Sequence, residues 1–388
     1  MDAPKYNGLT KVQPTLPSSY YIDPAHHERE LEAIWYRDWL YLCRADALPD
    51  PRSYRTFDIG SQQVLLVRDN EGTLRAFHNT CRHRGSVLCP KAEGRLRSGL
   101  ITCPYHSWSY DLEGALVRAP TLAEAVEFDL GAYRLYDVAL AEWGGFVFAN
   151  LLGKDAPPFE GSFDNDSESL DNWPLEDLVV GHVFEKTMAC NWKVFWENFN
   201  ECLHCPGLHP ELSELVPIYN RAIMMERDDP NWASHGNTED PKFKGGLRDG
   251  ARTWSMDGEA HGPEFPGLSD RDRAAGHTYV MNLPTFFAVG HVDYVRAVRL
   301  RPLGPEQTEL RAEWLFSPEA LADPAFDLAN IVDFATLVME QDATACELNQ
   351  RGLHSLRHEA GVLMPEEYAV HQFHQWVRGA LDNTDARV

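Results

Sequence analysis

The chain has 388 residues, of which 44% are hydrophobic and 24% are charged, as in a globular protein large enough for two domains. Asp and Glu number 59 against 35 Lys and Arg, and the resulting net charge of −24 argues against nucleic acid or an anionic membrane as a partner. The first twenty residues lack the apolar core of a signal peptide, and no apolar run is long enough to span a bilayer, so we expect a cytoplasmic protein.

The first half of the chain is predicted to be mostly β-structure. Residues 24–39 have the apolar spacing of an amphipathic helix, within an N-terminal segment at residues 1–45 that we expect to pack on the second domain. Residues 46–155 then alternate short strands with turns, including a hairpin with strands from Val64 to Arg68 and from Leu74 to His78. This stretch is predicted to be a small all-β domain.

The second half is predicted to be a mixed domain at residues 173–388, joined by an acidic linker at residues 156–172. The periodicity predicts helices at 191–205, 329–349 and 365–381 and strands at 278–301 and 307–316. Residues 226–275 show little periodicity and are predicted to be a loop that could cover a site. The expected fold class is therefore α+β, with an all-β domain followed by a domain whose antiparallel sheet is flanked by helices.

Two Cys and His pairs lie in the all-β region, nineteen residues apart: Cys81 with His83, and Cys103 with His106. Two thiolates and two imidazoles could hold zinc, or a Rieske [2Fe-2S] cluster with both thiolates on one iron and both imidazoles on the other. Each pair follows a predicted strand, so two loops could clasp a cluster, and this context favours the cluster. We expect the eight cysteines of a cytosolic chain to be free, buried or metal-bound rather than disulfide-linked, with Cys89 a packed free thiol.

The two loops also resemble a known family. FHNTCRHRG and CPYHSWSYDLEG are similar to the Rieske domain of ring-hydroxylating-type oxygenases over about residues 60–118. The resemblance implies that Cys81, His83, Cys103 and His106 bind the cluster. The spacer between the pairs is slightly longer than usual in the family, and its extra length at 91–98 is predicted to be loop.

A second group of metal-type residues lies in NWKVFWENFNECLHCPGLHP, at 191–210. On a helix, Glu201 and His204 share one face, together with Lys193, and the Cys205-Pro-Gly sequence should break the helix so that His209 turns back towards His204. Periodicity alone would make this an amphipathic helix with a solvent-exposed polar face. A redox cluster in the same chain needs an electron acceptor, however, and this favours a metal site.

The carboxylate of such a site is predicted to come from the helix at 329–349. Two His and one carboxylate form the facial triad of Fe(II) oxygenases. Asp342 is the one carboxylate on the apolar face of this helix, whereas Asp333 and Glu340 point the opposite way. A buried carboxylate is unfavourable unless it is paired or metal-bound, and Asn349 on the same face could donate a hydrogen bond.

ENFNECLHCPGLHPEL and EQDATACELNQRG look like the catalytic domain of the same family. The resemblance spans most of residues 20–385, apart from 226–275. It implies that His204, His209 and Asp342 bind a mononuclear iron and that Glu201 links His204 to the cluster-binding His106 of a neighbouring subunit. The family architecture implies a homotrimer or a dimer of trimers.

The predicted function is that of the terminal oxygenase component of a Rieske non-haem iron oxygenase. It would use O2 and electrons from NAD(P)H, delivered by a separate reductase, because the chain shows no GxGxxG or flavin-binding segment. The first motif alone would also permit an iron–sulfur electron carrier or redox sensor, or a zinc-stabilised binding protein. Three irons per chain would favour the oxygenase, and two would favour the carrier.

The substrate is predicted from a closer resemblance. GLTKVQPTLPSSYYIDP, NECLHCPGLHPEL and QDATACELNQRGL resemble the branch with glycine-betaine, carnitine and stachydrine demethylating oxygenases and choline monooxygenase. This implies a quaternary ammonium substrate, which suits the charge of −24 and an aromatic cage, although that charge also serves solubility. Leu203 stands where related demethylases often carry Tyr, so the cage could be incomplete. The alternative is an aromatic substrate that is hydroxylated or demethylated. Candidate cage residues, each of which could instead be core, are Phe199, Trp254, Tyr279, Phe286, Phe287 and Tyr294.

Overall fold

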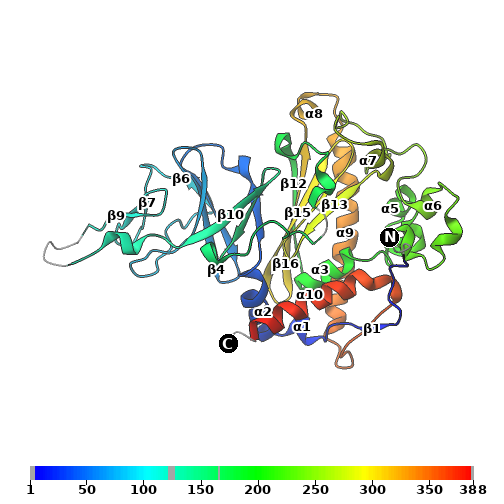
Figure 1. The fold of residues 1–388 in the computed structure, drawn as a ribbon, viewed down its shortest axis with the longest axis horizontal. Coiled ribbons are helices and arrows are strands. Elements are labelled where there is room, and N and C mark those ends of the chain that lie inside the picture. The colour runs from blue at the N-terminus through cyan, green and yellow to red at the C-terminus, as the bar shows by residue number, and fades with distance from the viewer. Residues whose placement is uncertain (1–4, 121–126, 165–166, 386–388) are drawn as a thin grey trace. The chain divides into compact units, whose positions relative to one another are not determined.

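The computed structural model describes residues 5–120, 127–164 and 167–385 (Figure 1). The chain forms two compact units: a β unit of residues 34–162 with 282–284, and an α+β unit of residues 1–33, 163–281 and 285–388. The predicted fold class, an all-β domain with a mixed domain built on an antiparallel sheet, is confirmed. The division at residues 45, 155 and 172 stays a prediction. In the described residues, no helix has both the length and the apolarity needed to cross a bilayer.

The β unit contains a seven-stranded sheet in the order β2-β11-β10-β5-β4-β3-β6 and a three-stranded sheet in the order β7-β8-β9. The strands are β2 (Leu40–Arg44), β3 (Ser53–Ile59), β4 (Gln62–Arg68), β5 (Leu74–His78), β6 (Glu93–Arg95), β7 (Ile101–Thr102), β8 (Ser109–Tyr110), β9 (Leu116–Arg118), β10 (Asp137–Trp143) and β11 (Phe146–Asn150).

The predicted hairpin is present as the antiparallel pair β4 and β5. Its turn forms because the Asp69 carboxylate accepts hydrogen bonds from the backbone N–H groups of Glu71 and Thr73, and Gly72 takes a positive φ of 90°. Asp111 accepts two such bonds in the β8–β9 turn, from Glu113 and Ala115. The two loops that carry the Cys and His pairs follow β5 and β7.

The α+β unit is built on a five-stranded sheet in the order β12-β16-β15-β14-β13, in which the β12–β16, β16–β15 and β15–β14 pairs are antiparallel. The strand predicted at 278–301 is divided into three. The strands are β12 (Val179–Met188), β13 (Thr278–Asn282), β14 (Phe286–Gly290), β15 (Val295–Gly304) and β16 (Gln307–Phe316), and a separate pair joins β1 (Gln13–Pro14) to β17 (Val362–Leu363).

Three helices accompany this sheet: α3 (Trp192–Phe199), α9 (Leu328–Leu353) and α10 (Tyr368–Asp385) (Figure 1). Helix α9 contacts both α3 and β12, and α3 contacts α10. The helices predicted at 329–349 and 365–381 are present with slightly different ends. The predicted helix 24–39 is shorter: α1 (Ser19–Ile22) and α2 (Pro24–Glu30) are followed by one π-helical turn at Leu31–Trp35.

The polar face of α3 is not exposed to solvent, although exposure was the alternative that periodicity alone indicated. Lys193 is fully buried, and its ammonium lies 2.6 Å from the carboxylate of Glu30 in α2, which is also fully buried. Glu197 accepts hydrogen bonds from the hydroxyl of Tyr21, at 2.5 Å, and from the imidazole of His374, at 2.8 Å. Lys193 and Glu197 therefore pair with residues of α1, α2 and α10 instead of facing water.

The loop predicted at 226–275 is mostly irregular, as expected, with the short helices α6 (Pro241–Lys244) and α7 (Asp270–Ala275). Its hydrogen bonds include a cap in which Ser269 and Asp272 exchange bonds at the start of α7. Three further short helices occur in the unit: α4 (Cys205–Leu208), α5 (Pro210–Leu215) and α8 (Pro318–Ala322).

Candidate metal sites and the adjoining cavity

The Cys and His pairs of the β unit occupy two similar tight loops. In the first, Gly85 N–H donates to the carbonyl of Cys81 and Cys81 N–H donates to the carbonyl of Ser86. In the second, Ser107 N–H donates to the carbonyl of Cys103, whose own N–H donates to Trp108. The loops thus present their cysteines in the same way.

The two loops bring their imidazoles together at the outside and bury their thiols. The ring centroids of His83 and His106 lie 4.7 Å apart, whereas Cys81 and Cys103 are only 3% and 2% exposed. His83 stacks on the indole of Trp108 at 4.9 Å. The Tyr110 hydroxyl lies 3.3 Å from the Cys81 sulfur and accepts a hydrogen bond from Arg82 N–H.

This arrangement fits a Rieske cluster, which needs two thiolates on one side and two imidazoles on the other. Cys89 lies outside it: the thiol is free and buried, and burial raises its pKa to about 12. It is therefore an unreactive packed thiol, as predicted.

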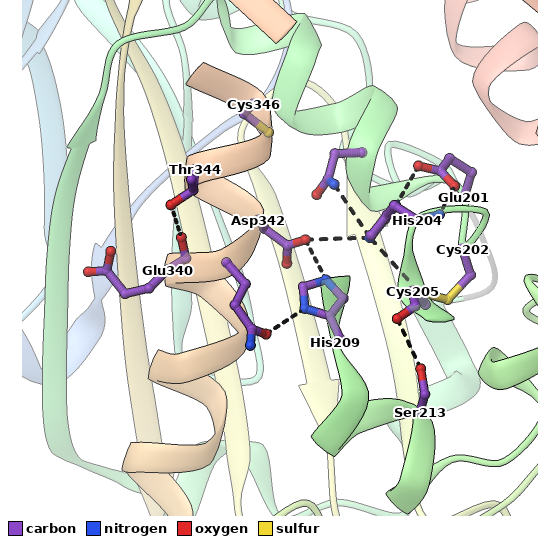
Figure 2. Close-up of polar contacts among 12 residues, drawn as sticks. Glu201, Cys202, His204, Cys205, His209, Ser213, Glu340, Asp342, Thr344 and Cys346 are labelled. Atoms are coloured by element: carbon purple, nitrogen blue, oxygen red, sulfur yellow. Dashed lines mark hydrogen bonds and ion pairs between the residues drawn. A yellow bond between two sulfur atoms is a disulfide. The ribbon is translucent and has the colours of Figure 1, made fainter. Parts of the chain in front are cut away.

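In the α+β unit, His204, His209 and Asp342 converge on one point, as Figure 2 shows. The Nε2 atoms of His204 and His209 lie 3.4 and 2.8 Å from the same carboxylate oxygen, Oδ1 of Asp342. One ligand atom from each of the three residues lies within 4.8 Å of the others. Two imidazoles and one carboxylate at this spacing could hold a divalent metal ion.

The outer nitrogens of both imidazoles have carboxylate or amide partners. Nδ1 of His204 lies 2.5 Å from Glu201 Oε1 (Figure 2). Nδ1 of His209 lies 2.7 Å from Gln341 Oε1. Because these oxygens can only accept, each Nδ1 carries the proton, and each Nε2 can offer a lone pair to a metal. The donor set therefore fits a metal ion bound at the two Nε2 atoms.

The path of the chain to these residues differs from the prediction. Helix α3 ends at Phe199, so Glu201 and His204 lie in the turn that follows it and not on a continuous helix. The Glu201 carboxylate accepts from the backbone N–H groups of Leu203 and His204, which competes with helical hydrogen bonding. Pro206 does not end a helix but lies in the first turn of α4.

A disulfide joins Cys202 to Cys205, so the expectation of no disulfides is wrong for this pair. The turn brings their Cα atoms to 5.0 Å, a distance that a disulfide can span. The other six cysteines are buried and form no disulfide among the described residues.

The charges at the triad are strongly coupled. Burial would raise the pKa of Asp342, but hydrogen bonds to His204 and His209 outweigh burial and hold that pKa below its usual value. Burial would lower the pKa of His204, yet the hydrogen bonds to Asp342 and Glu201 raise it to about 9. Without a metal ion, a proton therefore takes the place between His204 and Asp342.

Asp342 occupies the inner face of α9 as predicted, among Ile331, Ala335, Val338 and Cys346. Glu340 points away and pairs with Lys186 at 2.6 Å. Asn349 is exposed instead of bonding near Asp342, and the buried amide of the helix is that of Gln350, which accepts from Asn191 N–H.

A cavity of about 110 Å³ adjoins the triad and is lined by both histidines and by Asp342. Four of the six candidate cage residues line it: Phe199, Trp254, Tyr279 and Phe287. The other two, Phe286 and Tyr294, are fully buried and are not among the lining residues. Leu203 is 37% exposed and does not line the cavity either.

Sequence reasoning missed several residues of the site. Gln341 orients His209, the amide of Asn198 lies 3.4 Å from His204 Nε2, and Arg296 lines the cavity. Gln341 could have been found from the sequence, because it directly precedes the predicted ligand Asp342. Arg296 could not be singled out, because it is one of three Arg residues on the same strand.

Two family profiles match the chain: "Ring hydroxylating alpha subunit (catalytic domain)" over residues 175–383 and "Rieske [2Fe-2S] domain" over residues 38–134. The first includes residues 226–275, which the sequence analysis left outside the resemblance, so that exclusion is wrong.

Individual relatives agree with these profiles. A glycine betaine monooxygenase oxygenase subunit of Chromohalobacter salexigens is 30% identical and covers 93% of this chain and 84% of its own length. A chloroplastic choline monooxygenase of Beta vulgaris is 28% identical, and the match covers 95% of this chain and 77% of that protein.

Two solved structures show the same fold. The quaternary ammonium Rieske monooxygenase CntA in complex with gamma-butyrobetaine has a TM-score of 0.68 at 22% identity, with 95% of each chain covered. A naphthalene 1,2-dioxygenase with indole bound has a TM-score of 0.66 at 18% identity, with 98% of this chain and 97% of that chain covered.

Proposed function

Because the chain belongs to the ring-hydroxylating alpha-subunit family, with a Rieske [2Fe-2S] domain, we propose that it is the terminal oxygenase that oxidises a quaternary ammonium compound. The observation that carries this proposal is the convergence of His204, His209 and Asp342 at an aromatic-walled cavity. A chain of this family is an O2-dependent oxygenase, not an electron carrier alone.

We assign the metal ligands residue by residue. Cys81, His83, Cys103 and His106 would hold the [2Fe-2S] cluster, and His204, His209 and Asp342 would hold the mononuclear iron. When bound, the two iron groups supply electron transfer and the reductive activation of O2. The buried thiols, the paired imidazoles and the inward-facing Nε2 atoms support these assignments.

The surrounding residues hold the ligands in one geometry. Glu201 and Gln341 keep the Nδ1 protons of His204 and His209 in place and so fix the tautomer of each ring. Phe199, Phe287 and Val289 line the cavity with apolar groups that exclude water next to the triad.

The proposed reaction is hydroxylation of an N-methyl group. One oxygen atom of O2 enters the C–H bond, the other leaves as water, and NAD(P)H supplies two electrons through the reductase. The resulting N-hydroxymethyl group loses formaldehyde and a proton, which leaves a tertiary amine. A quaternary ammonium suits this cavity because cations are stabilised over ring faces, and Phe199 and Phe287 lie with centroids 4.2 Å apart.

The aromatic wall could also hold an aromatic ring, so the test includes both classes. O2 uptake with a surrogate reductase would be measured for glycine betaine, carnitine, choline and simple aromatic acids. We expect uptake and formaldehyde release with one or more of the ammonium compounds. Uptake and product formation with aromatic acids alone would replace this proposal by the aromatic one.

Partners and organisation complete the proposal. We propose a separate flavin or ferredoxin-type reductase, a homotrimer or dimer of trimers, and a cytoplasmic location where NAD(P)H is available. In each ring, Glu201 would bridge His204 to the cluster ligand His106 of a neighbouring subunit. The exposed imidazole of His83 and the partly exposed one of His106 support electron exit at that end of the β unit.

A further inference from the structure

Arg296 is a buried cation in the wall of the cavity. It lies on β15, is only 6% exposed, and lines the same cavity as the triad. Its cross-strand neighbour on β14 is Val289, and Val298 is paired in the same way with Phe287. Because paired residues of an antiparallel sheet share a face, Arg296 lies on the same face as Val289 and Phe287, which also line the cavity.

No described residue forms an ion pair with this guanidinium, although the Asp342 carboxylate attracts its charge at longer range. Among residues 5–120, 127–164 and 167–385, Arg296 forms no ion pair, and its Nε is buried without a hydrogen-bond acceptor. Two other arginines of the same strand behave differently, since Arg299 and Arg301 both pair with Glu309. A buried charge without a partner is strongly unfavourable, so Arg296 is expected to have an anionic ligand when the cavity is filled.

The surroundings of Arg296 are poor in acceptors and contain further donors. The indole Nε1 of Trp254, another lining residue, is also buried without a partner in the described structure. Burial lowers the pKa of His277 to about 4, so this lining imidazole is neutral and carries no competing charge. The acidic lining residues are Glu201 and Asp342, and both are bonded to His204.

We propose that Arg296 binds a carboxylate of the substrate, so that the substrate is a zwitterion with a quaternary ammonium at one end and a carboxylate at the other. This inference rests on the proposed function and names its substrate class more narrowly. Arg is suited to this role because its planar guanidinium binds carboxylates with two parallel hydrogen bonds. An amino alcohol such as choline has the ammonium but no anion, and would leave Arg296 unpaired.

The cavity size agrees with such a molecule. A volume of about 110 Å³ holds only a small ligand. One cavity that contains both the triad and Arg296 could hold a methylated ammonium group near the iron ligands while the carboxylate reaches Arg296.

The test measures binding rather than turnover. Titration calorimetry on the anaerobic holoenzyme would compare glycine betaine and gamma-butyrobetaine with choline, for the wild type, Arg296→Met and Arg296→Lys. We expect the wild type to bind a betaine more tightly than choline. Arg296→Met should weaken betaine binding by about 10- to 100-fold and change choline binding by less than about 3-fold, because a charge-assisted hydrogen-bond pair is lost. Arg296→Lys should recover part of the loss.

Arg301→Met is the matched control, because it removes a guanidinium from the same strand that already has a protein partner. It should leave the preference for the betaine unchanged. Tighter binding of choline than of either betaine by the wild type, no binding of either class, or equal losses for betaine and choline in an Arg296→Met protein that retains its iron, would overturn the inference. O2 uptake separates the two proposals. Turnover of choline alone would keep the oxygenase function and remove the role of Arg296. Carboxylate binding without any oxygenation would keep the role of Arg296 and remove the oxygenase function.

Discussion

At the scale of single residues, the site separates the atoms that would bind metal from those that orient them. His204 and His209 each turn Nε2 inwards and Nδ1 towards an oxygen acceptor. Glu347, five residues beyond Asp342 on the same helix, instead accepts a hydrogen bond from Ala189 N–H. Position on the helix therefore decides which carboxylate belongs to the site.

We predict that His204→Ala or Asp342→Ala loses the mononuclear iron and turnover but keeps the cluster, because the cluster residues lie in the other unit. Glu347→Ala is the control and should keep all three irons. Iron content per chain and the Rieske electron-spin signal check both outcomes. Loss of iron in the Glu347 variant alone would show that the assignment of Asp342 is wrong.

The raised pKa of His204 predicts how iron binding depends on pH. In the metal-free protein, protonated His204 stabilises the folded state at low pH, and this contribution is lost as the pH rises through about 9. Iron must displace that proton, so its affinity should rise about tenfold per pH unit up to that range and then level off. Fe(II) titrations of protein lacking only the mononuclear iron, between pH 6 and 9, measure this slope.

Glu201→Gln provides the comparison for this pH prediction. It removes one of the two carboxylates that raise the pKa of His204, so the affinity should level off at a lower pH. An affinity that does not vary with pH in the parent protein would contradict the coupling between His204 and its two carboxylates.

At the scale of elements, the sequence predicted long periodic segments well but predicted poorly the turn after α3 that carries Glu201 and His204. Helix α9 and the β4–β5 hairpin follow from periodicity and turn chemistry, and the buried face of α9 identified Asp342. Periodicity alone indicated a solvent-exposed polar face for α3, but Lys193 of this helix pairs with Glu30, which is distant in the sequence. The end of α3 at Phe199 depends on the hydrogen bonds of Glu201, which spacing alone does not reveal.

The buried pair of Lys193 and Glu30 gives a stability prediction. Lys193→Met would leave the Glu30 carboxylate buried without its cation, which should destabilise the α+β unit by about 3–5 kcal/mol. Adding Glu30→Gln should recover part of that loss, because no uncompensated charge remains. Urea unfolding followed by tryptophan fluorescence measures both changes, since Trp192 donates to Glu30.

The control for this pair is Lys186→Met. Lys186 and Glu340 are separated by the same 2.6 Å but are 26% and 46% exposed, so the loss should be below about 1 kcal/mol. Equal losses for the two Lys variants would show that burial does not determine the strength of the Lys193 pair.

At the scale of the whole molecule, the charge of −24 favours encounter with cationic partners. It suits a positively charged docking face on the proposed reductase better than direct attraction of a zwitterion, which carries no net charge. The oxygenase also needs a route for electrons from the cluster to the mononuclear iron, and in the proposed ring that route runs between neighbouring chains through Glu201. A heterologous contact of this kind closes into a ring when its rotation allows.

The electron route can be tested by complementation. Cys103→Ser should lose the cluster and its brown colour, His204→Ala should lose the mononuclear iron, and each protein alone should be inactive. If electrons pass between chains, mixed rings restore activity, because one chain supplies the cluster and its neighbour supplies the iron. Glu201→Gln in all chains should retain both iron groups yet reduce turnover by about 10- to 100-fold, since a charge-assisted bond between two imidazoles becomes a neutral one. O2 uptake after co-refolding or co-expression of the two inactive chains gives the decisive measurement. A monomer that turns over at the full rate, or mixed rings without activity although both metal sites are loaded, would place the route within one chain instead.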